Sequence, residues 1–92
     1  MRITVHYMAQ AKWAAGRAVE QVERERSCTA QELVIQLARS GGEALRRLLL
    51  DGQGSLQPAL LLFVGDEQVS AGQAVLLRDG DMVTVLSPMA GG

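Results

Sequence analysis

The stretch TAQELVIQLARSGG, Thr29–Gly42, predicts the helix around which the rest of the fold is organised. It opens with a capping box, in which the Thr29 hydroxyl accepts from the Glu32 amide and the Glu32 carboxylate reaches back to the Thr29 amide. Apolar residues then recur at positions 30, 33, 34, 37 and 38, which form one helical face. Gly41 and Gly42 tolerate the left-handed conformation and end the helix. An apolar stripe of this kind needs a partner surface, so we expect the helix to lie on a sheet.

The residues before this helix predict a strand pair. Positions 3, 5 and 7 are apolar and alternate with positions 2, 4, 6 and 8, which is the period of a half-buried strand. Residues 9–16 then form a connection that ends in glycine. Residues 17–26 resemble an edge strand, although the run EQVERER is equally compatible with a helix.

The residues after the helix predict a second, shorter helix and then three strands. Residues 43–50 place leucines 45, 48 and 49 inward and arginines 46 and 47 outward. The continuously apolar run 59–64 indicates a central strand covered on both faces, and a Gly-Asp turn leads from it to a short strand at 68–69. Residues 75–77, the turn 78–81 and a strand at 82–86 complete the chain. This order predicts an α+β domain of the β-grasp type, with a mixed sheet of four to five strands on one main helix.

Composition excludes several classes of function. The longest apolar run, 59–64, is far shorter than the roughly 20 residues of a membrane span, and the N-terminus does not resemble a signal peptide. The single cysteine rules out an internal disulfide or a cysteine-rich metal cluster, which suits a reducing compartment. We therefore expect a cytoplasmic protein that binds neither metal nor membrane.

The charge distribution argues against nucleic acid as a partner. The net charge is −1, and residues 51–92 carry Arg78 against five acidic residues. One tyrosine, one tryptophan and one phenylalanine offer little surface for base stacking. An acidic surface suits a basic protein partner, although it also serves simply to keep a protein in solution.

Three residues that could carry chemistry have simpler interpretations. Cys28 precedes the helix cap and stands at the spacing of a hydrophobic staple with Leu33, so we expect it to be buried and exclude it from the site. His6 is the only histidine and has no nucleophile or acid at a recognisable spacing. Trp13 is expected to cover the core. The sequence therefore predicts no catalytic residue pair.

The last six residues, SPMAGG (87–92), lack any periodicity, and Pro88 ends strand pairing. We expect residues 1–86 to form the β-grasp domain and residues 87–92 to form a flexible C-terminal Gly-Gly tail.

Four segments of the chain resemble the MoaD/ThiS family of sulfur carriers, which are relatives of ubiquitin. They are ITVHYMAQAK (3–12), CTAQELVIQLA (28–38), LLFVGDEQV (61–69) and LRDGDMVTVLSPMAGG (77–92). In the last segment an Asp-Gly-Asp turn, a strand, a proline and a terminal Gly-Gly occur in the order of the family. The resemblance covers essentially the whole domain and implies the β-grasp fold already expected from the pattern.

The resemblance implies a carrier that is not itself an enzyme. A partner of the ubiquitin-activating type, an adenylyltransferase, would adenylate the Gly92 carboxylate with ATP, and sulfur would displace AMP to leave a thiocarboxylate. Gly91 suits this role because a tail without side chains enters a narrow channel and adopts φ values closed to other residues. The residues that would thread with it are Ala90, Met89 and Pro88. The carrier would hold no permanent cofactor, since the activating enzyme uses the ATP.

The resemblance leaves the sulfur acceptor open. The leading interpretation is the small subunit of molybdopterin synthase, whose large subunit would accept the sulfur. Alternatives are carriers for thiamine, cysteine, tRNA or secondary-metabolite thiolation. A second class is a ubiquitin-like modifier that joins Gly92 to protein lysines, and a third is a β-grasp interaction module with an inert tail.

Alternation along residues 82–86 predicts the surface that a partner would bind. If positions 83 and 85 face the core, positions 82, 84 and 86 face outward, next to the tail. The predicted partner-binding patch is therefore Met82, Thr84 and Leu86. His6 and Met8 could extend it by the same logic, although single exposed apolar side chains are also common without any function.

Overall fold

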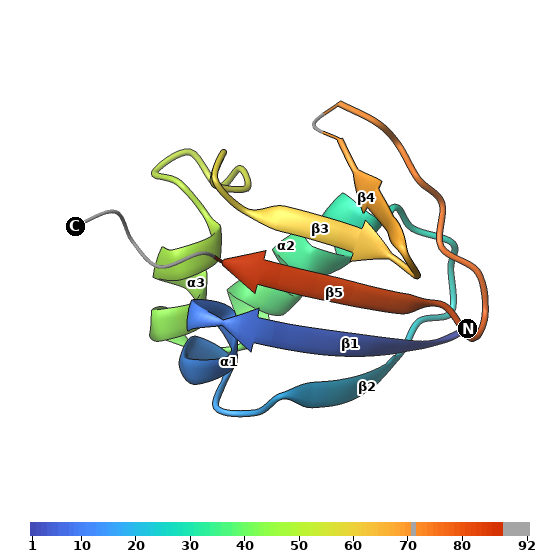
Figure 1. Cartoon of the computed structure of the whole chain (residues 1–92), viewed down its shortest axis with the longest axis horizontal. Coiled ribbons are helices and arrows are strands. Elements are labelled where there is room, and N and C mark those ends of the chain that lie inside the picture. Colours follow the sequence, from blue (N-terminus) through green and yellow to red (C-terminus); the bar gives the residue numbers. More distant parts are fainter. Residues whose placement is uncertain (71, 88–92) are drawn as a thin grey trace.

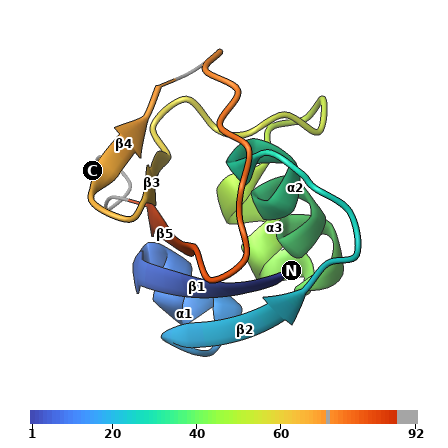
Figure 2. The ribbon, with the colours of Figure 1, turned by 90° about the vertical axis from the view of Figure 1, so that its right-hand side faces the viewer.

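A five-stranded mixed sheet carries two helices on one of its faces and a third, short helix at the end of its central strands in the computed structural model, which describes residues 1–70 and 72–87 (Figures 1 and 2). The strands are β1 (Arg2–Ala9), β2 (Val19–Glu23), β3 (Leu61–Val64), β4 (Glu67–Val69) and β5 (Met82–Ser87). The helices are α1 (Gln10–Ala15), α2 (Ala30–Ser40) and α3 (Glu43–Leu49). The sheet order is β2-β1-β5-β3-β4, with β1 and β5 parallel and the other pairs antiparallel. This arrangement confirms the expected α+β, β-grasp fold.

Helix α2 begins and packs as its sequence predicts. The Thr29 hydroxyl accepts a hydrogen bond of 3.1 Å from the Glu32 amide, and the Glu32 carboxylate accepts one of 2.8 Å from the Thr29 amide. The apolar stripe is buried along its whole length: Ala30, Leu33, Val34, Leu37 and Ala38. The capping box and the stripe together fix where α2 starts and which of its faces meets the sheet.

The two central strands supply the sheet's contribution to the core. Val5 pairs with Val83 and Tyr7 with Val85 across the parallel β1–β5 ladder, and all four side chains are buried. The Tyr7 hydroxyl donates a 2.8 Å hydrogen bond to the carboxylate of Glu20 on β2. Burial and this bond both raise the pKa of Tyr7, so the phenol remains a neutral donor.

Two expected elements differ in the structure. Residues 10–15, expected to be part of a connection, form the short helix α1, which packs against β1, β5 and α3. Residues 75–77, expected to be a strand, make a single bridge between Leu76 and Thr29. This segment runs past the start of α2, where no extended strand is available, so its pairing cannot continue.

The last strand is one residue longer than predicted. Ser87, which we assigned to the tail, is the final residue of β5, pairs with Ala9 and is buried. Pro88, Met89, Ala90, Gly91 and Gly92 lie outside the described residues. Within the described residues, no helix has the length and apolar character needed to cross a membrane.

The close approach at Gly41 gives a stability prediction. A Cβ atom added at this glycine would lie 2.7 Å from the Leu37 carbonyl oxygen and 2.7 Å from Leu45 Cδ2. The carbonyl is backbone and cannot move aside, so we expect Gly41→Ala to lower the free energy of unfolding by about 1–3 kcal/mol. Thermal denaturation should show a loss of roughly 4–8 °C for each kcal/mol.

The control is Gly52→Ala, because Gly52 has open space around its Cβ position and no positive φ. We expect this change to stay within about 0.5 kcal/mol of the parent. Equal melting temperatures for the two variants would contradict the assignment of Gly41 as a close-packing position.

Candidate functional site

The sheet face opposite the helices carries the candidate site, and we call it the outer face. Strand register places its side chains in rows, since directly paired residues point to the same face. One row joins Met8, Leu86 and Leu61 across β1, β5 and β3. The next row joins His6, Thr84 and Phe63. A third row contains Thr4 and Met82.

The row next to the end of β5 is the most apolar of the three. Met8, Leu86 and Leu61 are all apolar, and Met8 is 50% exposed. This row lies one residue before Ser87, so it borders the point from which residues 88–92 continue. At the opposite end of the outer face, Arg2 and Glu23 form an exposed ion pair of 2.8 Å. The outer face is therefore apolar at its tail end and charged at its far end.

The predicted partner-binding patch lies on this face, and its three residues differ in their distance from the end of β5. Val83 and Val85 are fully buried, and the residues between and beside them point outward as expected: Met82, Thr84 and Leu86. Met82, which is 41% exposed, lies four residues before Leu86 and hence about 13 Å further along the strand. Leu86 is thus the member of the patch that borders the tail.

Leu61 and Phe63 are members of this surface that the sequence analysis missed. Residues 59–64 were expected to form a strand covered on both faces, which is wrong, because in β3 only Leu62 is buried. Leu61 and Phe63 pair with Leu86 and Thr84 and share their outward direction. The sequence contained no signal that these two residues belong to the site, because a continuously apolar run does not show which of its faces is covered, and only the pairing of β3 with β5 places them beside Leu86 and Thr84.

Trp13 was expected to cover the core, and this is wrong, since its side chain is 81% exposed. Helix α1 turns Ala11 into the core and packs Ala14 and Ala15 against it. Trp13 is two residues from Ala11, a rotation of about 200° in a helix, so it faces away. Helix α1 follows β1 directly and contacts β5, so it lies at the end of the sheet where β1 and β5 end (Figure 1). Trp13 belongs to α1 and Met8 is near the end of β1, so both residues are at this end.

His6 is the histidine of the outer face. His6 is half-buried between Thr84 and Val19, and it makes no hydrogen bond to another described side chain. Among residues 1–70 and 72–87, no three His, Cys, Asp or Glu side chains are grouped so that they could hold a metal ion. What the outer face offers is an apolar contact surface beside a chain end.

Cys28 is buried, as predicted, and its environment suppresses its reactivity. Its exposed fraction is 8%, and Leu33, its expected staple partner, is fully buried. Burial is the main cause that raises the pKa of the Cys28 thiol, and the Glu32 carboxylate raises it further. Less thiolate is therefore present at neutral pH, and only the thiolate is nucleophilic.

We expect Cys28 to react with iodoacetamide at neutral pH at least roughly tenfold more slowly in the folded protein than in urea, because both burial and the raised pKa oppose thiolate attack. Mass spectrometry of timed samples gives the two rates. Equal rates in the folded protein and in urea would show that this thiol is accessible, and Cys28 would then be a candidate site residue.

Comparison with known proteins agrees with this architecture. The model of the ThiS family matches residues 5–92. No curated protein sequence matches significantly. The structure of SAMP1 from Haloferax volcanii superposes with a TM-score of 0.83 at 20% identity, with all of both chains covered. Urm1 from Trypanosoma brucei gives 0.73 at 25% identity, covering 99% of this chain and 95% of that one.

A further similar structure is a complex of subunits 1 and 2 of the molybdopterin-converting factor from Helicobacter pylori. Its matching chain gives a TM-score of 0.63 at 20% identity, with all of both chains covered. These structures share the β-grasp architecture of this chain. Because the family model spans residues 5–92, which cover most of β1, the other four strands and the Gly-Gly end, the chain belongs to the ThiS family.

Proposed function

We propose that this protein is a sulfur carrier whose Gly92 carboxylate is adenylated and then converted to a thiocarboxylate. The observation that carries the proposal is the apolar row of the outer face, which borders the last residues of β5 in a chain whose ThiS family match extends to Gly92. A partner that binds this row can take up the residues that follow Ser87. The carrier supplies the reacting group and the docking surface, and the partner supplies the catalysis.

The chemistry follows from the weakness of a carboxylate as an electrophile. The activating enzyme transfers AMP from ATP to a Gly92 carboxylate oxygen, and pyrophosphate leaves. A sulfur nucleophile then attacks the carbonyl carbon, a C–S bond forms, and the C–O bond to the AMP phosphate breaks. Attack by hydrosulfide gives the thiocarboxylate directly after loss of a proton. If the nucleophile is a donor's persulfide, a second thiol attacks the donor sulfur and forms a disulfide with it, so that the S–S bond to the carrier breaks and the thiocarboxylate is freed. The thiocarboxylate is a softer nucleophile than the original group and attacks an activated acceptor on a second partner.

Docking through the folded body is needed because the tail cannot bind strongly by itself. Fixing the backbone of a residue costs about 1–2 kcal/mol, so ordering residues 88–92 costs roughly 5–10 kcal/mol. This cost must be offset by contacts elsewhere. Met8, Leu61 and Leu86 provide an apolar surface for such contacts, and the 81% exposed Trp13 is the kind of residue that dominates the energetics of many interfaces.

For the acceptor, the leading candidate is the large subunit of molybdopterin synthase. This choice is supported by the structural similarity to a chain in the complex of the two molybdopterin-converting factor subunits. Carriers for thiamine, cysteine, tRNA or secondary-metabolite thiolation would use the same surface and tail. The similarity to SAMP1, a small archaeal modifier protein, favours one second candidate, a modifier that joins Gly92 to protein lysines.

Intact-mass measurement tests the proposal. The protein is incubated with ATP, a sulfur donor and the cognate activating enzyme, and the expected product has one terminal oxygen replaced by sulfur. An unchanged mass with an enzyme shown to adenylate its own substrate would refute the proposal. Lysine conjugates trapped from a cell lysate, in place of sulfur transfer to a small molecule, would identify the chain as a modifier.

A further inference from the structure

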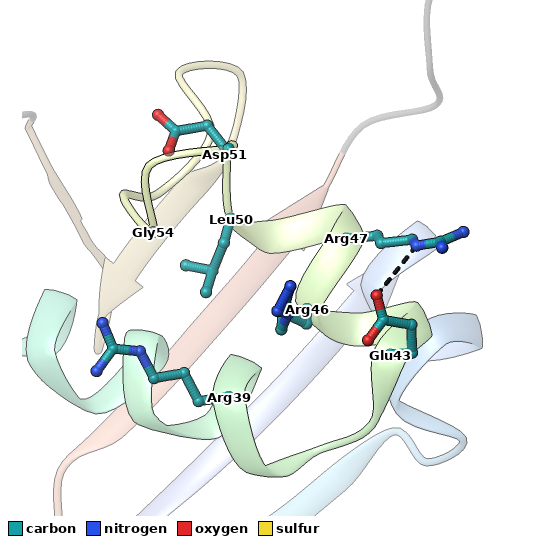
Figure 3. Close-up of a pocket in the computed structure, with 8 residues that line it drawn as sticks. Arg39, Glu43, Arg46, Arg47, Leu50, Asp51 and Gly54 are labelled. Carbon is teal, nitrogen blue, oxygen red and sulfur yellow. Dashed lines mark hydrogen bonds and ion pairs between the residues drawn. The ribbon is translucent and has the colours of Figure 1, made fainter.

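A second surface, on the helical side of the sheet, has the properties of an anion site. Residues from the end of α2, from α3 and from the loop that follows α3 line a cavity of about 420 Å³ (Figure 3). Three of them are arginines: Arg39, Arg46 and Arg47. Leu50 and the loop residues Gly52 and Gly54 complete most of the wall. None of the residues that line this cavity belongs to the rows of the outer face, so it is a different site from the one that borders the end of β5.

Two of the three guanidinium groups have no ionic partner among the described residues. Arg47 forms an ion pair of 3.1 Å with Glu43, one turn earlier on α3. Arg39 and Arg46 form no ion pair and donate no side-chain hydrogen bond within the part of the chain that the structure describes. Both residues lie in the last turn of a helix, where the helix dipole favours a positive charge. This interaction leaves the N–H groups of the two guanidinium groups free to donate hydrogen bonds to a ligand.

The one nearby carboxylate outside the Glu43–Arg47 pair is engaged in its own loop. Asp51 Oδ1 accepts hydrogen bonds from the amides of Gln53 (2.8 Å) and Ser55 (3.0 Å). Figure 3 shows this carboxylate on the outer side of the loop, directed away from Arg39 and Arg46. The loop approaches Arg39 through a glycine, since a Cβ atom at Gly54 would lie 3.7 Å from an Arg39 guanidinium nitrogen. The cavity thus presents two free guanidinium groups from two different helices.

From this geometry we infer that the cavity between α2, α3 and residues 51–54 binds the phosphate group of a small phosphate monoester. The three terminal oxygens of a phosphate monoester can accept hydrogen bonds from more than one guanidinium group, whereas a single carboxylate is satisfied by one guanidinium fork. The volume lies within the roughly 300–1,000 Å³ of small-molecule sites, which leaves room for an organic group beyond the phosphate. Nucleic acid does not fit, because the protein is net negative and the arginines form a pocket and not a stripe. This inference is independent of the proposed function.

The test is an NMR titration of the ¹⁵N-labelled protein with ribose 5-phosphate, inorganic phosphate and acetate at constant ionic strength. We expect saturable shifts of the amides of residues 51–54 and of the Arg39 and Arg46 side chains with ribose 5-phosphate, and weaker or no binding of acetate. The double variant Arg39→Gln/Arg46→Gln should bind at least tenfold more weakly, because it loses two charge-assisted contacts.

The matched control is Arg26→Gln/Arg78→Gln, which removes two exposed arginines that lie outside this cavity and form no ion pair with a described residue. Both double variants have the same net charge, so a general electrostatic effect would weaken binding equally. The control should bind within twofold of the parent, and the spectra show whether each variant is folded. Three results would each overturn the inference. The two double variants could lose the same amount of affinity, or acetate could bind as tightly as ribose 5-phosphate. The protein could also bind inorganic phosphate but not ribose 5-phosphate.

Discussion

Replacing Gly91 with valine is expected to reduce thiocarboxylate formation about 100-fold or more, with the loss in kcat. A β-branched side chain restricts φ and χ1 and adds width at the residue that precedes the reacting carboxylate. Displacement of a reacting group by about 1 Å is enough to cost roughly 100-fold in rate. The measurement is the initial rate of the intact-mass change at saturating carrier concentration.

The control for this variant is the same change at Gly52. Among the described glycines, Gly52 has open space at its Cβ position and an ordinary backbone conformation, so valine is accommodated there. Gly52→Val should load sulfur at the parent rate. If Gly91→Val loads sulfur as fast as Gly52→Val does, then the tail does not enter a narrow channel, and that part of the proposed mechanism fails.

Replacing Leu86 with arginine is expected to raise KM for the activating enzyme at least about 30-fold and to leave kcat nearly unchanged. Leu86 lies in the centre of the apolar row, between Met8 and Leu61. A charge placed there would be desolvated on docking, and hot-spot residues of interfaces contribute about 2 kcal/mol or more, which is roughly a factor of 30. Because the tail is unaltered, chemistry after docking should proceed as before.

Gln21→Arg is the matched control for Leu86→Arg. Gln21 also lies on the outer face, because it pairs with Thr4, but it is exposed on the edge strand β2, away from the apolar row. The same charge at this position should change KM by less than threefold. A similar rise in KM for both variants would indicate general electrostatics and would remove the apolar row as the docking surface. Thermal denaturation of both proteins shows that any difference does not arise from unfolding.

The two predictions separate docking from chemistry. Gly91→Val changes the tail and should alter kcat, whereas Leu86→Arg changes the folded body and should alter KM. If either variant changed both kcat and KM, docking and tail entry would be a single step.

Local patterns in the sequence were sufficient for most of the fold. The capping box at Thr29–Glu32 and the stripe of α2 depend on residues within one or two turns of each other, so the chain itself carries the information. The alternation in β1 and β5 is equally local, and it correctly separated Val83 and Val85 from Leu86.

The tertiary structure decided what depends on neighbours distant in the sequence. The run 59–64 does not state how many of its faces are covered, and the single helical layer leaves Leu61 and Phe63 on the outer face. Trp13 is exposed because α1 directs Ala11 inward. The sequence predicted a connection at residues 9–16, so the helix that sets the direction of Trp13 was not expected.

The same distinction applies to both candidate sites. The sequence determined the outward direction of Met82, Thr84 and Leu86, because strand alternation is a property of consecutive residues. Only the sheet register could join Met8, Leu86 and Leu61 into one row, and only helix packing could bring Arg39 and Arg46 to one cavity. The physical reason is that periodicity is set by the backbone of a single element, whereas a surface is formed by elements whose mutual positions are fixed by the burial of the core.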